Sequence, residues 1–233
     1  MATYLPPIEN PSSPVMKLVF RMSRRQFGKV ATPLRVFAAR MPAAFGSFYG
    51  KVSRLDRRMA LSSRTAVLIR EQVASINMCL FCMDAARWFA TKDSPEDARR
   101  FDALSEYGTS PLFSEAERAA LDYATELTRT KQVDPETFAR LARHYSEREI
   151  CDIVWVVASE HLYNMTNIGL NIGSDGLCEI PARRAAGPSP TRDIHVREGR
   201  RVMRGFVVSG MRWFHVWRVR SGTATVPPRV SHH

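Results

Sequence analysis

The chain has 233 residues, 45% of them hydrophobic, which is enough for one core-forming domain with extensions. No stretch reaches the roughly 18 uncharged apolar residues that a transmembrane helix needs, and no apolar N-terminal run precedes a cleavage site, so we expect a cytoplasmic protein without a transmembrane segment. The net charge of +11 lies mostly at one end: residues 187–233 hold nine Arg and two acids, a net +7, and 11 − 7 leaves +4 for residues 1–186.

The first third of the chain is expected to form a loose segment and then short helices. Residues 1–13 are rich in Pro and Ser, which predicts a loose N-terminal segment. From Pro14 onward, apolar residues recur at helical spacing with Arg and Lys opposite. Pro33 and Pro42 each fit the first turn of a further short helix.

A Cys-x-x-Cys motif, Cys79 and Cys82, follows the next predicted helix, which Ser62 or Ser63 can cap. Asn77 is expected to interrupt that helix, because an Asn side chain competes for backbone hydrogen bonds. A new helix then begins near the cysteines. The unpaired N–H groups and the dipole of its first turn favour a thiolate over a thiol. One helical turn also supplies the Cα separation of roughly 4.4–6.8 Å that a disulfide needs.

The sequence after the motif predicts four helix starts, each with a capping residue followed by an acidic residue or Pro. They lie at residues 94–97, 114–117, 134–136 and 146–149. Helices are expected behind the last three, over residues 119–130, 137–144 and 150 to about 170. We find no convincing alternating strand between residues 14 and 175, so the sequence predicts an all-α fold.

The domain organisation expected from these features has three parts. A loose N-terminal segment covers residues 1–13, a helical domain covers residues 14–180, and a basic tail covers residues 181–233. The tail interleaves Arg with Val, Phe and Trp and is expected to be poorly ordered. Its charge predicts a weak, salt-sensitive contact with polyanions.

Two stretches match the pattern of a known family. Residues 73–82 read VASINMCLFC, and residues 113–128 read FSEAERAALDYATELT. In this order and spacing they resemble the carboxymuconolactone decarboxylase superfamily, in its alkyl hydroperoxidase D-like (AhpD-like) branch. The resemblance covers roughly residues 35–178. It implies an AhpD-like helical bundle, a homo-oligomer (trimer or hexamer), and a thiol-dependent hydroperoxidase or disulfide reductase served by a thiol or dithiol reductant protein.

The resemblance also implies roles for the two cysteines. In the peroxidatic members the second cysteine attacks and the first resolves, which carries over to Cys82 as attacker and Cys79 as resolver. Those members carry a His four residues after the second cysteine and often another between the cysteines. Ala86 and Phe81 stand at these positions here. The family's Glu would fall near Val67, so the thiol pair matches and the proton relay does not.

Three titratable residues are candidates to replace that relay. Glu71 and Cys82 are eleven residues apart and share a face if the helix is unbroken, although Glu71 can equally pair with a neighbouring Arg on a solvated face. Asp84 can act at the site or cap the new helix. His161 can turn inward as a relay or be a hydrogen-bonded core residue.

The alternatives for the thiol pair remain open at this stage. The cysteines can form a redox dithiol, half of a zinc site, or part of the core. A zinc site needs two more ligands, and Cys151 and Cys178 are distant in sequence, so no metal or cofactor is expected. The alternative function is a non-catalytic, all-α oligomeric scaffold or binding protein that has lost the relay. A lactone decarboxylase is disfavoured, because that branch of the superfamily does not rely on a Cys-x-x-Cys pair.

Overall fold

Helices are the regular elements throughout the part of the chain that the structure describes. The computed structural model describes residues 2–91 and 97–179, with the helices α1 (Pro14–Phe27), α2 (Thr32–Val36), α3 (Pro42–Ala44), α4 (Gly50–Asp56), α5 (Ser63–Ile76), α6 (Leu80–Thr91), α7 (Ala98–Asp102), α8 (Glu115–Thr130), α9 (Pro135–Ala142) and α10 (Glu147–Ile168). The described residues also form the short 3-10 helices η1 (Ala38–Arg40), η4 (Leu104–Glu106) and η5 (Leu177–Glu179) and a π-helical turn, η2 (Phe45–Tyr49). The predicted all-α fold is confirmed. The expected tail, residues 181–233, and most of the helix start at 94–97 lie outside the described residues.

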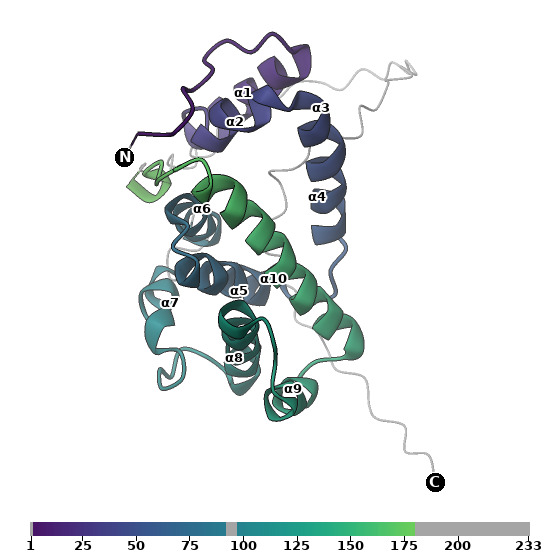
Figure 1. Ribbon diagram of the computed structural model, residues 1–233. Coiled ribbons are helices and arrows are strands. Elements are labelled where there is room, and N and C mark those ends of the chain that lie inside the picture. Colours follow the sequence, from purple (N-terminus) through teal and green to yellow (C-terminus); the bar gives the residue numbers. More distant parts are fainter. Residues whose placement is uncertain (1, 92–96, 180–233) are drawn as a thin grey trace, which may run out of the picture.

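The helices form two layers (Figure 1). One layer is a bundle in which α5 contacts α6, α8 and α10. The other layer is the N-terminal arm, α1 to α4, which covers one end of the bundle before α4 runs down beside α10 (Figure 1). The arm and the bundle meet near the start of α6 and the C-terminal part of α10.

Serine caps fix where several helices begin, as their residue types predict. Ser62 accepts a hydrogen bond from the amide of Thr65 at the start of α5. The two predicted capping boxes, at Ser114 for α8 and Ser146 for α10, are both present. Asp134 precedes the proline that opens α9, but its side chain makes no capping hydrogen bond.

The largest hydrophobic cluster lies where α5, α8 and α10 meet. Its members are buried side chains spaced three or four residues apart, among them Ile69, Val73, Ala120, Ala124, Ile153, Val156 and Val157. A second cluster joins α1 to α2 within the arm, around Met16, Phe20 and Leu34. The bundle and the arm therefore each have apolar packing of their own.

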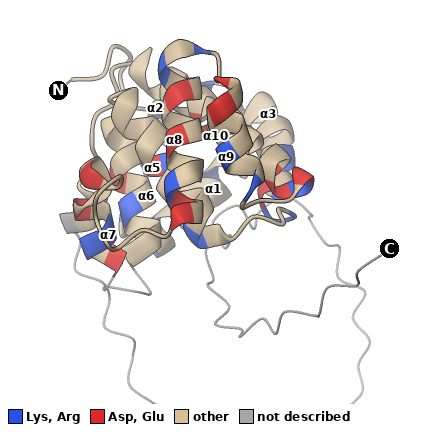
Figure 2. Ribbon diagram, turned by 90° about the horizontal axis from the view of Figure 1, so that it is seen from below, with Lys and Arg blue, Asp and Glu red and all other residues tan. Residues whose placement is uncertain are grey.

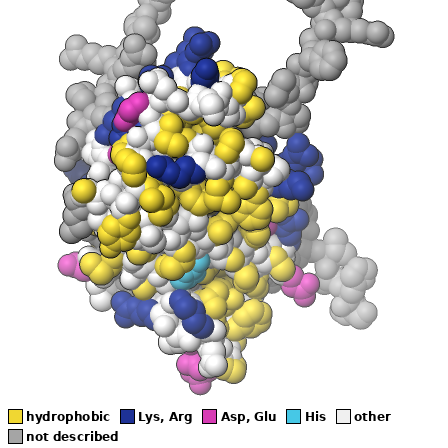
Figure 3. Space-filling view, turned by 45° about the horizontal axis from the view of Figure 1, so that its top comes forward, with side chains coloured by type: hydrophobic (Ala, Val, Ile, Leu, Met, Phe, Trp, Pro, Cys, Tyr) yellow, Lys and Arg dark blue, Asp and Glu magenta, His cyan; other side chains and the backbone are white. Residues whose placement is uncertain are grey.

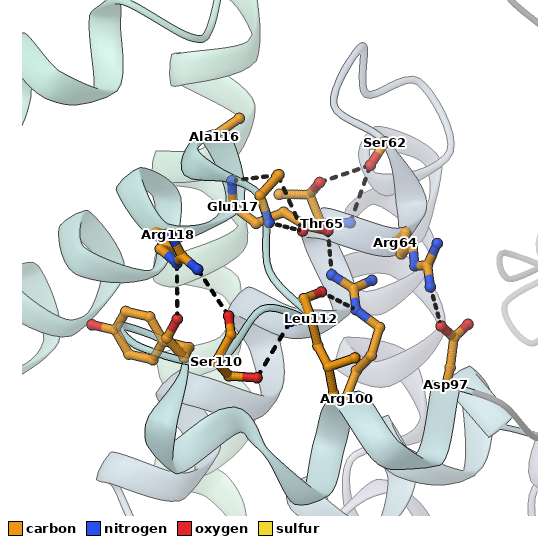
Figure 4. Close-up of polar contacts among 12 residues, drawn as sticks. Ser62, Arg64, Thr65, Asp97, Arg100, Ser110, Leu112, Ala116, Glu117 and Arg118 are labelled. Carbon is orange, nitrogen blue, oxygen red and sulfur yellow. Dashed lines mark hydrogen bonds and ion pairs between the residues drawn. The ribbon is translucent and has the colours of Figure 1, made fainter.

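The loop between α7 and α8 is tied to the bundle by two arginines (Figure 4). Arg100 pairs with Glu117 at 2.5 Å and donates to the carbonyl of Leu112. Arg118 donates to the carbonyls of Tyr107 and Ser110. These bonds satisfy loop carbonyls that no helix would pair.

The N-terminal segment differs from the expected loose one. Its backbone is hydrogen-bonded to two parts of the fold: Tyr4 N–H donates to the carbonyl of Leu170 at the end of α10, and Ile8 N–H donates to the carbonyl of Arg35 in α2. Side chains add three more contacts, Arg40 to the Pro6 carbonyl, Asn171 to the Ala2 carbonyl, and the Arg35–Glu9 ion pair. The Pro and Ser content of this segment predicted a loose structure. That prediction failed because composition carries no information about hydrogen-bond partners far along the chain.

Acidic and basic residues are interspersed over the described helices (Figure 2). None of the helices in residues 2–91 and 97–179 has the length and hydropathy to cross a bilayer. In the same residues, no group of three or more His, Cys, Asp or Glu side chains is placed to hold a metal ion.

Candidate functional site

The two cysteines lie at the sharp turn between α5 and α6. Asn77 follows the last residue of α5, and Met78 has a positive φ of 57°, which reverses the chain. The amide of Cys79 then donates to the carbonyl of Ala74 at 2.9 Å. Leu80 begins α6, so Cys79 directly precedes the helix and Cys82 lies in its first turn, close to the predicted position. They are joined as a disulfide with a Cα–Cα distance of 5.3 Å, and both are buried.

Asn167, in the last turn of α10, contacts both sulfur atoms. Its Nδ2 lies 3.3 Å from Cys82 Sγ and 3.8 Å from Cys79 Sγ. Sequence reasoning missed this residue, because 85 positions separate it from Cys82. The available signal was an Asn among the apolar residues of a predicted helix, at helical spacing from Glu160 and Asn164, because a buried polar side chain needs a partner.

A cavity of about 500 Å³ opens between the arm and the bundle beside the disulfide. Cys82 and Asn167 line it, whereas Cys79 does not. Its walls are mainly apolar and aromatic and come from both layers, including Phe27, Leu34, Phe37, Phe45, Tyr49, Phe81, Phe89 and Tyr163. Such a cavity suits an apolar ligand and has Cys82, but not Cys79, in its wall.

One wall of the cavity carries a buried ion network. Arg70 of α5 lies 3.1 Å from Glu160 of α10 and 3.3 Å from Asp56 of α4. Asn164 donates to the second oxygen of Glu160 at 2.7 Å, and the Arg70 guanidinium lies 5.9 Å from the centre of the Tyr163 ring. Burial raises the pKa of Glu160, and the charge of Arg70 opposes that rise. The network ties three helices together at the cavity.

Glu71, the neighbour of Arg70, is buried on α5 but is not among the residues that line the cavity. Its Oε2 has no hydrogen-bond partner among the described residues. Burial, with a smaller contribution from the charge of Glu160, raises the pKa of its carboxyl to about 8. Glu71 is therefore protonated at neutral pH, in contrast to a solvated ion-pair partner.

The sequence comparisons find two uncharacterized relatives. No family model matches the chain. An uncharacterized Escherichia coli protein, YnjA, is 29% identical over 70% of this chain and 90% of its own, and an uncharacterized Bacillus subtilis protein, YdfG, is 26% identical over 51% and 82%.

Solved structures give the fold. A structure of the debrominase Bmp8 in complex with 2,3,4-tribromopyrrole has a TM-score of 0.65 at 22% identity, covering 77% of this chain and 95% of that one. A Ralstonia eutropha peroxidase-related protein, described as an alkylhydroperoxidase AhpD core, has a TM-score of 0.64 at 18% identity, covering 75% and 94%. The chain has an AhpD-like fold. The expected AhpD-like helical bundle is thus confirmed.

In this AhpD-like chain, Ala86 stands one helical turn after Cys82 and lines the cavity. The resemblance implies a relay histidine at that position, so the wall beside the sulfur carries a methyl group in its place. Phe81, at the other histidine position, also lines the cavity and packs against the dithiol. The site is accordingly more apolar than the family pattern predicts.

The structure places Asp84 in an anchoring position. Its carboxylate accepts hydrogen bonds from the Ser174 hydroxyl at 2.8 Å and from the amides of Leu177 and Cys178 at 2.8 and 3.2 Å. Burial opposes the charged form, but these donors outweigh it and lower the pKa of Asp84. The alternative role, a cap at the start of α6, is not the one observed, because the carboxylate binds the segment after α10.

His161 lies on α10 but does not line the cavity. Its Nδ1 is 3.1 Å from Nδ2 of Asn77, which also donates to Asn164 at 2.8 Å. Burial, followed by the charge of Lys131, lowers the pKa of His161. Of the candidates named from the sequence, the structure brings Cys79 and Cys82 together at the cavity and leaves Glu71, Asp84 and His161 outside it.

Proposed function

We propose that this AhpD-like chain is a thiol-dependent hydroperoxidase in which Cys82 attacks and Cys79 resolves. One observation carries the proposal: the disulfide partner that lines the apolar cavity is Cys82. A substrate in the cavity would meet that sulfur first. The neighbouring cysteine, already within bonding geometry, is placed to receive the second step.

The chemistry balances with a hydroperoxide as oxidant and a dithiol as reductant. The Cys82 thiolate attacks the distal oxygen of R–O–OH, the O–O bond breaks, and the alkoxide takes a proton and leaves as R–OH. Cys82 is then a sulfenic acid, and the Cys79 thiol condenses with it to give the disulfide and water. An external dithiol reduces that disulfide by exchange and is itself oxidised.

The lining of the cavity supports an apolar organic hydroperoxide as the substrate. Phe37, Phe45 and Phe89 offer aromatic surface to an alkyl or aryl group, and burying that surface is favourable. The positive charge of Arg70 is already held by Glu160 and Asp56. A carboxylate on the substrate would therefore approach two acids for one buried arginine, so we expect neutral hydroperoxides to be preferred.

The test is consumption of cumene hydroperoxide with dithiothreitol as reductant, followed by stopped flow. Cys82→Ser should abolish turnover. Cys79→Ser should permit one attack for each chain and then stall as a sulfenic acid or over-oxidise. Cys151→Ser is the matched control, because Cys151 is an exposed free cysteine on α10 outside the cavity, and it should behave as wild type. Equal rates for wild type and Cys82→Ser would leave the non-catalytic scaffold as the better reading.

A second candidate, reductive removal of a halogen from a small aromatic ring, is favoured by the aromatic walls and size of the cavity. The debrominase Bmp8 has the same fold and was solved with a brominated pyrrole. The balance is Ar–Br plus two thiols giving Ar–H, a disulfide, bromide and a proton. Bromide release from 2,3,4-tribromopyrrole, absent in Cys82→Ser, would favour this activity over hydroperoxide reduction.

A further inference from the structure

Asn167 is held firmly where α10 ends beside the dithiol. It is buried, and its backbone carbonyl accepts the amides of Leu170 at 3.2 Å and Ile172 at 2.9 Å. The segment that follows is fastened to α6 by Asp84, through Ser174, Leu177 and Cys178. The segment that follows Asn167 is thus joined to the helix that carries Cys82, which holds the end of α10 beside the dithiol.

The Asn167 side-chain amide lies closer to one sulfur than to the other. Nδ2 is 3.3 Å from Cys82 Sγ and 3.8 Å from Cys79 Sγ. An N–H donor stabilises a thiolate more than a thiol, because hydrogen bonds to a charged acceptor are stronger than those to a neutral one. The preference therefore falls on the sulfur that also lines the cavity.

The charged groups around the pair are engaged by other partners and do not supply the same selectivity. Arg70 of α5 is engaged by Glu160 of α10 and by Asp56 of α4. On α6, Arg87 pairs with Asp102 at 2.5 Å, and Asp84 is engaged by the segment after α10. Burial raises the pKa of the Glu71 carboxyl to about 8, so this group is mainly protonated and uncharged at neutral pH.

From this geometry we propose that Asn167 is a catalytic residue that selects Cys82 as the attacking thiol by hydrogen bonding to its sulfur in the thiolate state. The role of attacker rests on the proposed function, but the hydrogen bond does not. A neutral amide cannot take up the thiol proton, so Asn167 stabilises the thiolate and leaves proton removal to solvent. From a different helix, and by donation alone, it would take over part of the role that the family pattern gives to a histidine.

The experiment measures the pKa of each thiol separately, from the ultraviolet absorbance of the thiolate in the reduced full-length chain. Cys151→Ser and Cys178→Ser remove the background, and Cys79→Ser or Cys82→Ser leaves one thiol of the pair. We expect Cys82 to have the lower pKa. Asn167→Leu, which keeps the side-chain size and removes the donor, should raise the pKa of Cys82 by about one to two units and leave that of Cys79 nearly unchanged.

Two further variants separate a direct effect from a general loss of packing. Asn167→Asp places a carboxylate beside the sulfur and should raise the pKa of Cys82 at least as far as Asn167→Leu does. Asn164→Ala is the matched control: it removes a fully buried asparagine from the same helix, and that asparagine bonds to Glu160 and Asn77. It should leave the pKa of Cys82 within a few tenths of a unit.

The outcomes distinguish this inference from the proposed function. A shift confined to Cys82 in the Asn167 variants supports the inference even if no hydroperoxide is consumed, in which case the proposed function alone fails. Equal shifts of both cysteines, an unchanged Cys82, or an equal shift in Asn164→Ala would overturn it, whatever the turnover of the wild type.

Discussion

The carboxyl group of Glu71 is buried with one oxygen unpaired among the described residues, and its pKa is raised to about 8 from an ordinary value of 4.5. The folded chain keeps this proton at pH values where the unfolded chain has released it. Stability from Glu71 is therefore fully present below about pH 4.5 and is lost as the pH rises through about 8.

Glu71→Gln removes this dependence. Urea unfolding across a pH series should show the free energy of unfolding of the wild type falling, relative to the variant, by a few kcal/mol between about pH 5 and 9, since each pKa unit corresponds to about 1.4 kcal/mol. Glu136→Gln, at an exposed position at the start of α9, should keep the wild-type profile. Parallel curves for Glu71→Gln and wild type would show that Glu71 is ionised in the fold.

Ala86 stands on the cavity wall one turn after Cys82, where an added base would reach the sulfur. If the chain is a hydroperoxidase, Ala86→His should raise the rate of hydroperoxide consumption, since general acid–base help is typically worth about 10²–10⁴-fold. Overpacking should cost about 1–3 kcal/mol of stability, because Ala86 is buried. Ala90→His, one turn further along and away from the cavity, serves as control, and an equal gain there would contradict the explanation.

For single residues, the sequence predicted the thiol pair and little of what surrounds it. The Cys-x-x-Cys spacing and the break at Asn77 are local, so they predicted that Cys79 and Cys82 lie at or near the first turn of α6. Asn167 and Glu160 meet α5 and α6 only through the packing of α10. No periodicity along one helix reports which helix will face it, so these partners needed the structure.

The ion network of Arg70 joins α4, α5 and α10. Arg70→Met would leave Asp56 and Glu160 buried without their partner, so we expect a loss of about 3–5 kcal/mol in the free energy of unfolding. Arg64→Met is the matched control on the same helix: its side chain is 55% exposed in its pair with Asp97, and the loss should stay below about 1 kcal/mol. Denaturant unfolding measures both, and similar losses would show that burial of the network adds nothing.

The elements themselves were predictable in proportion to how local their signals are. The capping boxes at Ser114 and Ser146 predicted the starts of α8 and α10, because the residues that satisfy the first N–H groups lie within one turn. The π-helical turn η2 and the bonds that hold residues 2–13 were not foreseen. Both depend on contacts with distant parts of the chain: Tyr49 of η2 stacks near Tyr163 of α10, and Tyr4 bonds to Leu170.

For the whole molecule, the outward face of α10 suggests how copies assemble. The exposed residues of this helix beyond its first turn carry no charge: Cys151, Val154, Ala158, Met165 and Ile168. Hydrophobic side chains also gather in a band across the face drawn in Figure 3, with charged groups mainly around it. We propose that the chain is a homo-oligomer that buries this helix face, since monomers rarely expose such stretches.

Met165→Lys tests that proposal, because Met165 lies on the face and is 54% exposed. A lysine there should shift the mass measured by light scattering toward the monomer while helical content is unchanged. Phe138→Lys, at a position 46% exposed on α9, should leave the mass unaltered. A wild-type chain that is already monomeric at micromolar concentration would contradict the proposal.

The cavity draws its two kinds of wall from different parts of the chain. The thiol and the polar and charged groups come from α5, α6 and α10, at Cys82, Arg70, Glu160 and Asn167. Much of the apolar surface comes from the arm, at Phe27, Leu34, Phe37, Phe45 and Tyr49. If the proposed function holds, changes in the arm would alter which molecules fit while Cys82 and its neighbours on α5, α6 and α10 stay the same. A directed-evolution library that randomises these five arm positions should then change the range of hydroperoxides consumed at little cost to the thiol pair.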